Sequence, residues 1–242
     1  MAALPLQARA SGPVLGRSNW QMAPGERAAI EGLLSDLKPR LSIEIGTAQG
    51  GSLERIAAHS DEVHTFDLGA EVEQDAFPNV TFHRGDNHVL LPRLLAHLER
   101  ERRNVDFVLV DGDHTREGVR RDLEDLLASG AVRRTYIVLH DTMNENVARG
   151  LATVDLDAHP KVVFVDFGFV ALRQAPRGLQ EIWGGLGVVI CDADATLGVV
   201  PERRDHDGSL PAALAAGIWR LLAPARAAKW RAMTIARRLR RR

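Results

Sequence analysis

Two short apolar stretches near the middle of the chain are each followed by side chains that can carry chemistry. Asp111 and His114 follow residues 105–110, and His140 and Asp141 follow the next such stretch. Carboxylates bind cations or accept protons, and imidazole changes its charge near neutral pH. The residue types therefore predict proton transfer or metal-dependent chemistry, provided that the fold brings the four side chains together.

The elements that must position these side chains are two strands. Residues 105–110 and 136–139 are short, apolar and rich in β-branched residues, as buried strands are. Neighbouring strands lie about 4.8 Å apart, so Asp111 and Asp141 would approach each other closely at one sheet edge. Two carboxylates at that distance repel unless one is protonated or a cation lies between them. Mg²⁺ is the simplest such cation, and we expect Asp111, His140 and Asp141 to bind it.

The two histidines are the candidate general bases of this site, because imidazole titrates near neutral pH. For His114 or His140 taken alone, a structural role explains the residue at least as well. Asp113 has a similar alternative, since it can cap a helix that begins near Thr115. The carboxylate pair is therefore the stronger signal.

A glycine-rich loop at residues 44–52 connects an earlier apolar strand to a helix. Such a loop can present backbone N–H groups to a ligand. A phosphate-binding loop of a nucleotide hydrolase requires a lysine, and none lies between Gly51 and Ser52. A dinucleotide-binding loop prefers a glycine where this chain has Ala48, which disfavours NAD without excluding it. S-adenosylmethionine, which has no phosphate, fits the loop best.

Acidic residues at successive strand ends supply the other contacts that a nucleoside needs. Asp67 ends the next strand, 21 residues after Gly46, where an acid binds ribose hydroxyls in such folds. Asp86 follows the third strand and is placed to meet the adenine amino group. Glu44 lies within an apolar strand and needs a partner when buried. The predicted cofactor site comprises Glu44, Gly46, Thr47, Ala48, Gly51, Ser52, Asp67, Asp86 and Asp111.

Strands alternate with helices along most of the chain, which indicates parallel β–α–β units and a doubly wound α/β sheet. After Pro160, two apolar runs resemble a hairpin that closes the sheet. The predicted strands cover residues 41–46, 62–66, 80–83, 105–110, 136–139 and 161–165, and the hairpin runs cover 162–170 and 187–190. The predicted helices cover residues 24–37, 52–58, 88–102, 116–127 and 145–154.

The composition fits one larger domain with extensions. The 242 residues are 45% hydrophobic and 26% charged, which argues against a disordered or collagen-like chain. No apolar run approaches the ~20 residues of a membrane-spanning helix, and the N-terminal residues lack the pattern of a secretory signal. The single cysteine, Cys191, excludes an intramolecular disulfide and favours a reducing compartment such as the cytoplasm.

Charge is distributed unevenly along the chain. Residues 226–242 carry eight basic side chains and no acidic one, so the rest of the chain has a net charge of −9. We expect no nucleic-acid partner, because a duplex-binding face is basic. The basic, tryptophan-containing helix predicted after Pro211 would pack on the body, or contact an anionic membrane surface or a second copy of the chain. We expect an N-terminal lead-in and helix (1–40), a cofactor-binding domain (41–200) and a basic helical tail (201–242).

In order, the motifs resemble those of class I S-adenosylmethionine-dependent methyltransferases. They are Glu44-Ile-Gly-Thr-Ala-Gln-Gly-Gly-Ser52, Val110-Asp-Gly-Asp-His-Thr-Arg-Glu-Gly-Val119 with Asp122-Leu123, and Ile137-Val-Leu-His-Asp-Thr142. The nearest branch contains the cephalosporin hydroxylase and rhamnosyl O-methyltransferase type proteins, and the metal-dependent catechol and caffeoyl-CoA O-methyltransferases are similar more distantly. The resemblance covers roughly residues 43–190.

This resemblance implies a Rossmann-like, mostly parallel sheet of seven strands whose last strand is antiparallel. It implies cofactor contacts at Glu44, Gly46, Asp67 and Asp86, and a divalent metal at Asp111 and Asp141. The chain departs from the metal-dependent relatives at His140, where they have a carboxylate. Imidazole at this position bears on the choice between Mg²⁺ and a softer ion.

We therefore expect methyl transfer from S-adenosylmethionine to a hydroxyl oxygen of a small molecule, such as a sugar or a natural product. Two alternatives remain open. An NAD-dependent oxidoreductase is disfavoured by Ala48 and leaves the carboxylate pair without a use. A non-catalytic, methyltransferase-like module would act through its basic tail. Residues around Trp20, Asn144 and Trp183 are expected to recognise the acceptor, but they form no motif.

Overall fold

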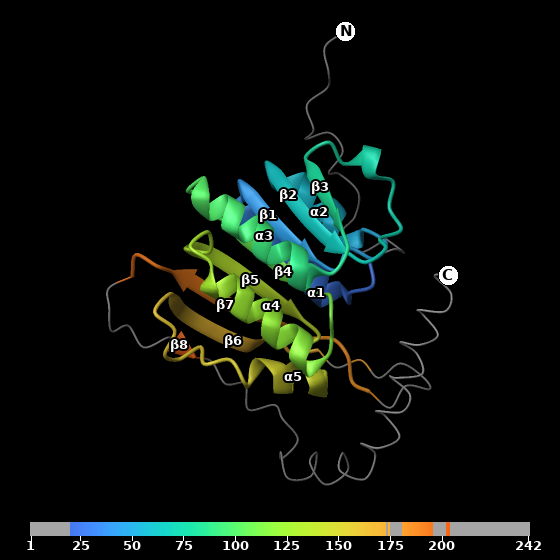
Figure 1. Ribbon diagram of the computed structural model, residues 1–242. Helices are drawn as coiled ribbons and strands as arrows, with labels where there is room; N and C mark the ends of the chain where they lie inside the picture. Colours follow the sequence, from blue (N-terminus) through green and yellow to red (C-terminus); the bar gives the residue numbers. More distant parts are fainter. Residues whose placement is uncertain (1–19, 173, 175–180, 196–201, 204–242) are drawn as a thin grey trace. The chain divides into compact units, whose positions relative to one another are not determined.

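The computed structural model describes residues 20–172, 174, 181–195 and 202–203 (Figure 1). Within them the chain forms a sheet between two layers of helices. The helices are α1 (Pro24–Leu37), α2 (Gly51–His59), α3 (Asn87–Arg100), α4 (Arg116–Ala128) and α5 (Glu145–Leu151), with a 3₁₀ turn at Gln74–Ala76. The strands are β1 (Leu41–Ile45), β2 (Glu62–Asp67), β3 (Val80–Arg84), β4 (Phe107–Val110), β5 (Arg134–His140), β6 (Val162–Val170), β7 (Leu186–Asp192) and β8 (Glu202–Arg203).

The strands lie in the order β3-β2-β1-β4-β5-β7-β6-β8. From β1 the chain first adds strands on one side and then, starting with β4, on the other, as in a doubly wound fold. Strands β1 to β5 pair in parallel, whereas β7 runs antiparallel to both β5 and β6. The predicted sheet of seven strands with an antiparallel last strand is confirmed. An eighth strand, the two residues of β8, pairs with β6 at the edge of the sheet, and the sequence pattern did not predict this strand. The basic helix predicted after Pro211 lies outside the described residues.

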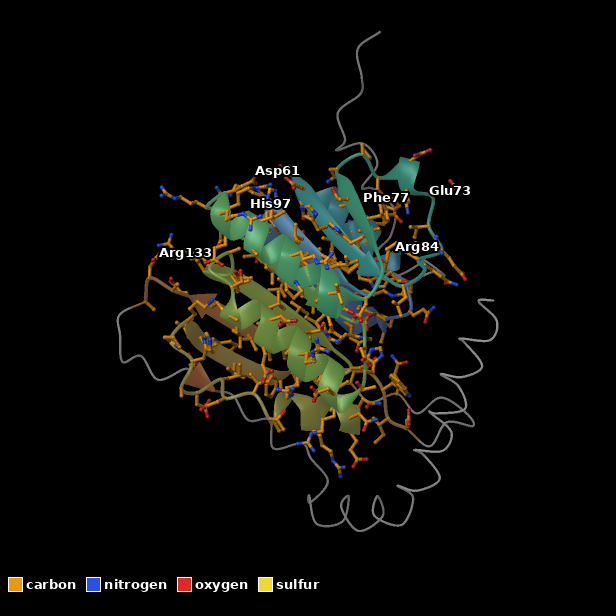
Figure 2. All side chains as sticks on the ribbon, in the orientation of Figure 1. Asp61, Glu73, Phe77, Arg84, His97 and Arg133 are labelled. Atoms are coloured by element: carbon orange, nitrogen blue, oxygen red, sulfur yellow. The ribbon has the colours of Figure 1, made fainter. Side chains whose placement is uncertain are left out.

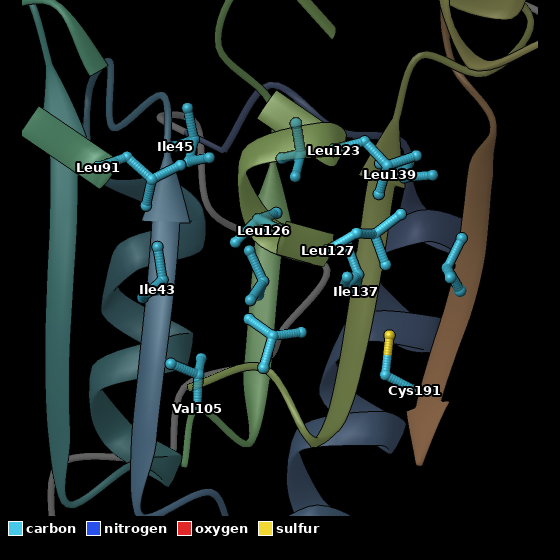
Figure 3. Packing of buried hydrophobic residues seen from close by; sticks show 14 of the residues in the cluster. Ile43, Ile45, Leu91, Val105, Leu123, Leu126, Leu127, Ile137, Leu139 and Cys191 are labelled. Carbon is cyan, nitrogen blue, oxygen red and sulfur yellow. The ribbon is translucent and has the colours of Figure 1, made fainter. Parts of the chain in front are cut away.

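Apolar side chains on both faces of the strands explain why helices cover both faces. Figure 3 shows Leu91 of α3 beside Ile45 and Leu123 of α4 beside Leu139, on the face where these residues form one cluster. On the other face α1 and α2 pack against alternate residues of the same strands, such as Leu109. Every residue of β1 and β4 is buried. These central strands are therefore held rigidly, and so are the residues that follow them.

The ends of the parallel strands define the two ends of the sheet. Figure 2 shows Asp61 and Arg133, which precede β2 and β5, at one end, and Arg84, the last residue of β3, at the other. The predicted site residues lie at or near the carboxyl ends of β1 to β5. Ligands of open α/β sheets bind at this edge, where the strand order reverses.

Pairing with β7 sets the length of β5. The predicted strand covered residues 136–139, whereas β5 pairs with β7 from Arg134 to His140. His140 is therefore the last residue of the strand, and its side chain follows the alternation of the strand towards the face that α1 covers. Helix α5 ends at Leu151, three residues before its predicted end. No helix in the described part of the chain is long and apolar enough to cross a bilayer.

Candidate active site

The glycine-rich loop begins where the chain after β1 passes close to the chain after β4. Gly46 has a φ of 96°, and a Cβ atom there would lie 2.1 Å from the backbone oxygen of Asp111. Gly50 caps α2 with a φ of 77°. A Cβ on Gly51 would lie 2.3 Å from Trp20 Cα. The glycines are therefore required by close backbone contacts, and they place the loop beside the residues that follow β4.

Asp67 holds this loop in place. Its Oδ2 accepts hydrogen bonds from the backbone N–H groups of Thr47 (3.1 Å) and Ala48 (3.0 Å), and its Oδ1 accepts one from Gly69 (2.6 Å). A carboxylate has about four acceptor positions, so roughly one remains for a ligand. Asp67 is half-buried, so its carboxylate can contact the loop and still be reached by a nucleoside.

Glu44 lies behind the loop and has the partners that its burial requires. The side chain is fully buried, and Ser52 Oγ and Thr65 Oγ1 each donate a hydrogen bond of 2.6 Å to it. Burial raises the pKa of Glu44 to about 7, although the two hydroxyls oppose the shift. Glu44 ties the first turn of α2 to β2. Its predicted contact with the cofactor stays a prediction.

Asp86 caps α3 at the same end of the sheet. Its Oδ1 accepts a hydrogen bond from the backbone N–H of His88 (2.9 Å), and its side chain is exposed. The adjacent Asn87 donates to the buried carboxylate of Asp122 on α4. The first turn of α3 is thus anchored to α4, which gives Asp86 a fixed position.

The tertiary structure brings Asp111, His114, His140 and Asp141 into one cluster. His114 Nε2 lies 3.1 Å from Asp111 Oδ1 and 3.1 Å from Asp141 Oδ2. His140 Nδ1 lies 2.9 Å from Asp111 Oδ1 and 3.4 Å from Asp141 Oδ2. One ligand atom from each residue lies within 4.8 Å of the others. The predicted approach of the two carboxylates is confirmed, and both histidines stand between them.

Electrostatics in this cluster are dominated by the two carboxylates. Burial alone would lower the pKa of His114, but hydrogen bonds and charge from Asp111 and Asp141 outweigh it and raise that pKa to about 9. The same balance holds the pKa of His140 well above its ordinary value. Burial would raise the pKa of Asp141, but the two histidines lower it below its usual range. The cluster therefore demands positive charge, supplied by protonated imidazoles or by a cation.

Glu26 belongs to the same cluster, and the sequence analysis did not identify it. Its side chain is fully buried, and its Oε1 lies 3.5 Å from His140 Nε2. It comes from α1, outside the glycine loop and the two strand ends. The available signal was its spacing, since Glu26, Ile30 and Leu34 form one buried helix face on which a carboxylate is unexpected.

Trp183 borders the cluster through His114. Its ring meets the ring of His114 edge to face at a centroid distance of 5.3 Å. Among the described residues, its buried Nε1 and the buried Oγ1 of Thr142 have no hydrogen-bond partner. Asn144 donates to the backbone oxygen of Ile182, which fixes the segment before Trp183. Of the three residues expected around the acceptor, Trp183 and Asn144 therefore lie near the cluster, and Trp20 lies against α2.

Residues 43–142, which carry the glycine loop and all four members of the cluster, match a protein family described as a methyltransferase domain. The match covers β1 to β5, the part of the sheet whose carboxyl ends form the site, so this part of the chain is similar to a methyltransferase domain. A search of curated proteins finds no significant match.

Solved structures share the fold of this chain. An O-methyltransferase from Bacillus cereus, in complex with SAH, is 18% identical, with a TM-score of 0.50 over 72% of this chain and 84% of that one. A putative O-methyltransferase from Klebsiella pneumoniae is 17% identical, with a TM-score of 0.54 over 78% and 94%. Cofactor-bound Rv0187 from MTB is 16% identical, with a TM-score of 0.53 over 73% and 84%. At these identities the likeness concerns the fold.

Proposed function

We propose that this chain transfers the methyl group of S-adenosylmethionine to a hydroxyl oxygen of a small molecule, with assistance from a divalent cation. The observation that carries the proposal is the contact between Gly46 and the backbone of Asp111, because it places a nucleoside-binding loop directly beside a carboxylate–histidine cluster. The O-methyltransferase from Bacillus cereus, which has the same fold and holds SAH, supports this assignment.

The cofactor would bind along the loop that Asp67 holds. The methionine end would meet the backbone of Gly46 to Ser52, whose glycines let this loop pass close to Asp111 and Trp20. The remaining acceptor capacity of Asp67 suits a ribose hydroxyl, and Asp86 suits the adenine amino group. This chain therefore offers an acid at each position where the nucleoside presents a donor.

In the reaction, the acceptor oxygen attacks the methyl carbon, the carbon–sulfur bond breaks, and S-adenosylhomocysteine leaves as a neutral thioether. The hydroxyl proton would pass to His114 in its neutral form, because a cation bound by Asp111 and Asp141 would replace the positive charge that otherwise keeps this imidazole protonated. Alignment of the two substrates supplies most of the remaining rate enhancement. A divalent cation bound by Asp111, His140 and Asp141 would hold the acceptor oxygen and lower its pKa. The donor set fits such an ion, since four ligand atoms converge and carry two carboxylate charges.

Calorimetry with S-adenosylhomocysteine tests the cofactor assignment. The wild-type chain should bind it at micromolar concentrations, and Asp67→Ala should weaken binding by about tenfold or more, the value of one lost charged hydrogen bond. Asp61→Ala is the matched control, because Asp61 precedes β2 at the opposite end of the sheet and should leave binding unchanged. Absence of binding to the wild-type chain would contradict the proposal.

A chelator tests the assisting cation separately. Methyl transfer to an acceptor found by screening hydroxylated compounds should fall after EDTA treatment and return when a divalent ion is added. Asp111→Asn should reproduce the loss. Activity that persists in both experiments would remove the cation from the proposal and leave the methyltransferase assignment intact.

A further inference from the structure

Two consecutive backbone N–H groups connect Glu26 to the carboxylate–histidine cluster. Gly184 N donates to Asp141 Oδ1, and Gly185 N donates to Glu26 Oε1 at 2.6 Å. Both glycines have positive φ angles, 89° and 88°. A Cβ on Gly185 would lie 2.8 Å from Met143 and 2.9 Å from Thr142. This tight turn therefore fixes the two carboxylates relative to each other, although one belongs to α1 and the other follows β5.

Each oxygen of Glu26 has a separate structural connection. Oε2 accepts the backbone N–H of Ala23 at 2.7 Å and so closes the first turn of α1. Oε1 accepts Gly185 and faces His140 Nε2 at 3.5 Å. Helix capping needs only the first contact. Burial of a carboxylate is costly, and the second oxygen is buried where it meets the imidazole.

The orientation of the His140 ring separates its two nitrogens. Nδ1 faces Asp111 and Asp141. Nε2 faces Glu26 Oε1 at 3.5 Å and makes no hydrogen bond within the described part of the chain. With a cation between Asp111 and Asp141, the carboxylate opposite Nε2 would favour the tautomer that carries its proton there. The lone pair of Nδ1 would then point into the cluster. A carboxylate that fixes the ring of a ligating histidine in this way is typical of metal sites.

We propose that Glu26 is a positioning residue that holds His140 with Nδ1 available as a metal ligand, and that the cluster consequently prefers a divalent transition ion such as Mn²⁺ or Co²⁺ to Mg²⁺. Mg²⁺ requires hard oxygen ligands, whereas imidazole suits transition ions. The inference rests on the cation in the proposed function. It proposes a transition ion where the sequence analysis expects magnesium, and it gives α1 a role in the site.

Metal binding to the full-length chain, stripped of metal by a chelator, tests the preference directly. Free Mn²⁺ is measured by electron paramagnetic resonance during titration, and Mg²⁺ is added as competitor. We expect Mn²⁺ to bind at least tenfold more tightly than Mg²⁺. Glu26→Gln should weaken Mn²⁺ binding by about 10- to 100-fold, the usual effect of removing such a supporting carboxylate. Asp36→Asn, an acid-to-amide change on the exposed face of the same helix, should leave it unchanged.

A spectroscopic signature distinguishes positioning from a general effect on folding. In the Co²⁺-loaded chain, a histidine bound through Nδ1 shows a paramagnetically shifted, exchangeable proton on Nε2. We expect this proton in the wild-type chain, protected by burial against Glu26. In Glu26→Gln it should exchange faster with solvent, whereas Asp36→Asn should retain the wild-type rate.

His140→Asn keeps the inference testable even if Glu26→Gln does not fold. Asparagine places an oxygen at the branch point where His140 has Nδ1, so the variant should bind Mn²⁺ and Mg²⁺ with affinities within about threefold of each other. Equal affinities in the wild-type chain, absence of divalent-ion binding, or an effect of Glu26→Gln below twofold would each overturn the inference. S-adenosylhomocysteine calorimetry on the same samples separates the outcomes. If SAH binds and the preference is absent, this inference fails while the proposed function stands.

Discussion

His114 Nε2 and Asp141 Oδ2 lie 3.1 Å apart, although one residue follows β4 and the other follows β5. The register explains the contact, because Val110 and Leu139 are paired in neighbouring parallel strands. Asp141 adopts a φ of 58° directly after its strand, and its Oδ1 accepts the N–H of Gly184. The carboxylate is thus held in a conformation that most residues disfavour, as is common at functional sites.

Replacement of His114 tests its role as the base. His114→Gln should lower methyl transfer by roughly 10²- to 10⁴-fold, the usual contribution of a general base, while affinity for S-adenosylhomocysteine stays unchanged. Steady-state kinetics and calorimetry measure the two effects. His97→Gln, on the exposed side of α3, is the control and should keep full activity. A reduction below tenfold in His114→Gln would exclude this residue as the base.

Gly46 and Gly32 form a matched pair that tests the close approach of β1 and β4. Gly46→Ala should lower the free energy of unfolding by roughly 2–4 kcal/mol, because it combines an unfavourable positive φ with a clash against backbone. Gly32 lies within α1, and a Cβ there meets nothing within 4 Å. Gly32→Ala should therefore stabilise the chain by about 0.5–1 kcal/mol. Urea unfolding measures both, and equal effects would contradict the packing described for Gly46.

The buried carboxyl of Asp122 predicts a specific dependence of stability on pH. Burial raises its pKa to about 8, with further contributions from Asp113 and Asp125. The folded chain therefore retains a proton that the unfolded chain has released, so the wild type loses stability as pH rises from about 4 to about 8. The slope is at most about 1.4 kcal/mol per pH unit.

Asp122→Asn should remove this contribution. Its free energy of unfolding, relative to wild type, should increase between pH 5 and pH 8, as measured by urea unfolding at each pH. Asp36→Asn provides the exposed comparison and should follow the wild type. Parallel curves for wild type and Asp122→Asn would show that Asp122 has an ordinary pKa.

Ser52→Ala tests the hydrogen bond that stabilises the buried carboxylate of Glu44. Because burial raises the pKa of Glu44 to about 7, the carboxylate is mostly charged at pH 8 and mostly neutral at pH 5.5. Loss of the Ser52 donor should therefore cost about 1.5–3 kcal/mol at pH 8 and about 1 kcal/mol at pH 5.5. Ser35→Ala, on the exposed face of α1, should change the free energy of unfolding by less than about 0.5 kcal/mol at both pH values. A pH-independent effect of Ser52→Ala would contradict the assignment.

Much of the fold could be predicted from local patterns. Apolar strands alternating with amphipathic helices specify a doubly wound sheet, because each element must bury its apolar face and parallel strands need crossover helices. Glycines at positions 46 and 50 predicted a strand–loop–helix junction. In the structure both adopt positive φ angles, which most other residues disfavour. Strand ends were less predictable. The full length of β5 depends on β7, which lies far away in the sequence.

The sequence by itself determined which side chains would reach the carboxyl edge of the sheet. Asp67, Asp111 and Asp141 lie at the carboxyl ends of strands in the β–α–β pattern, so they were expected at one sheet edge, and close together if their strands were neighbours. Only the tertiary structure decided what surrounds them. The contact of Glu26 with His140 and Gly185 depends on how α1 packs across the sheet, and no local spacing specifies that packing. The alternation of strands and helices limits which strands can be neighbours, whereas the partner of a buried charge is set by the packing of the whole fold.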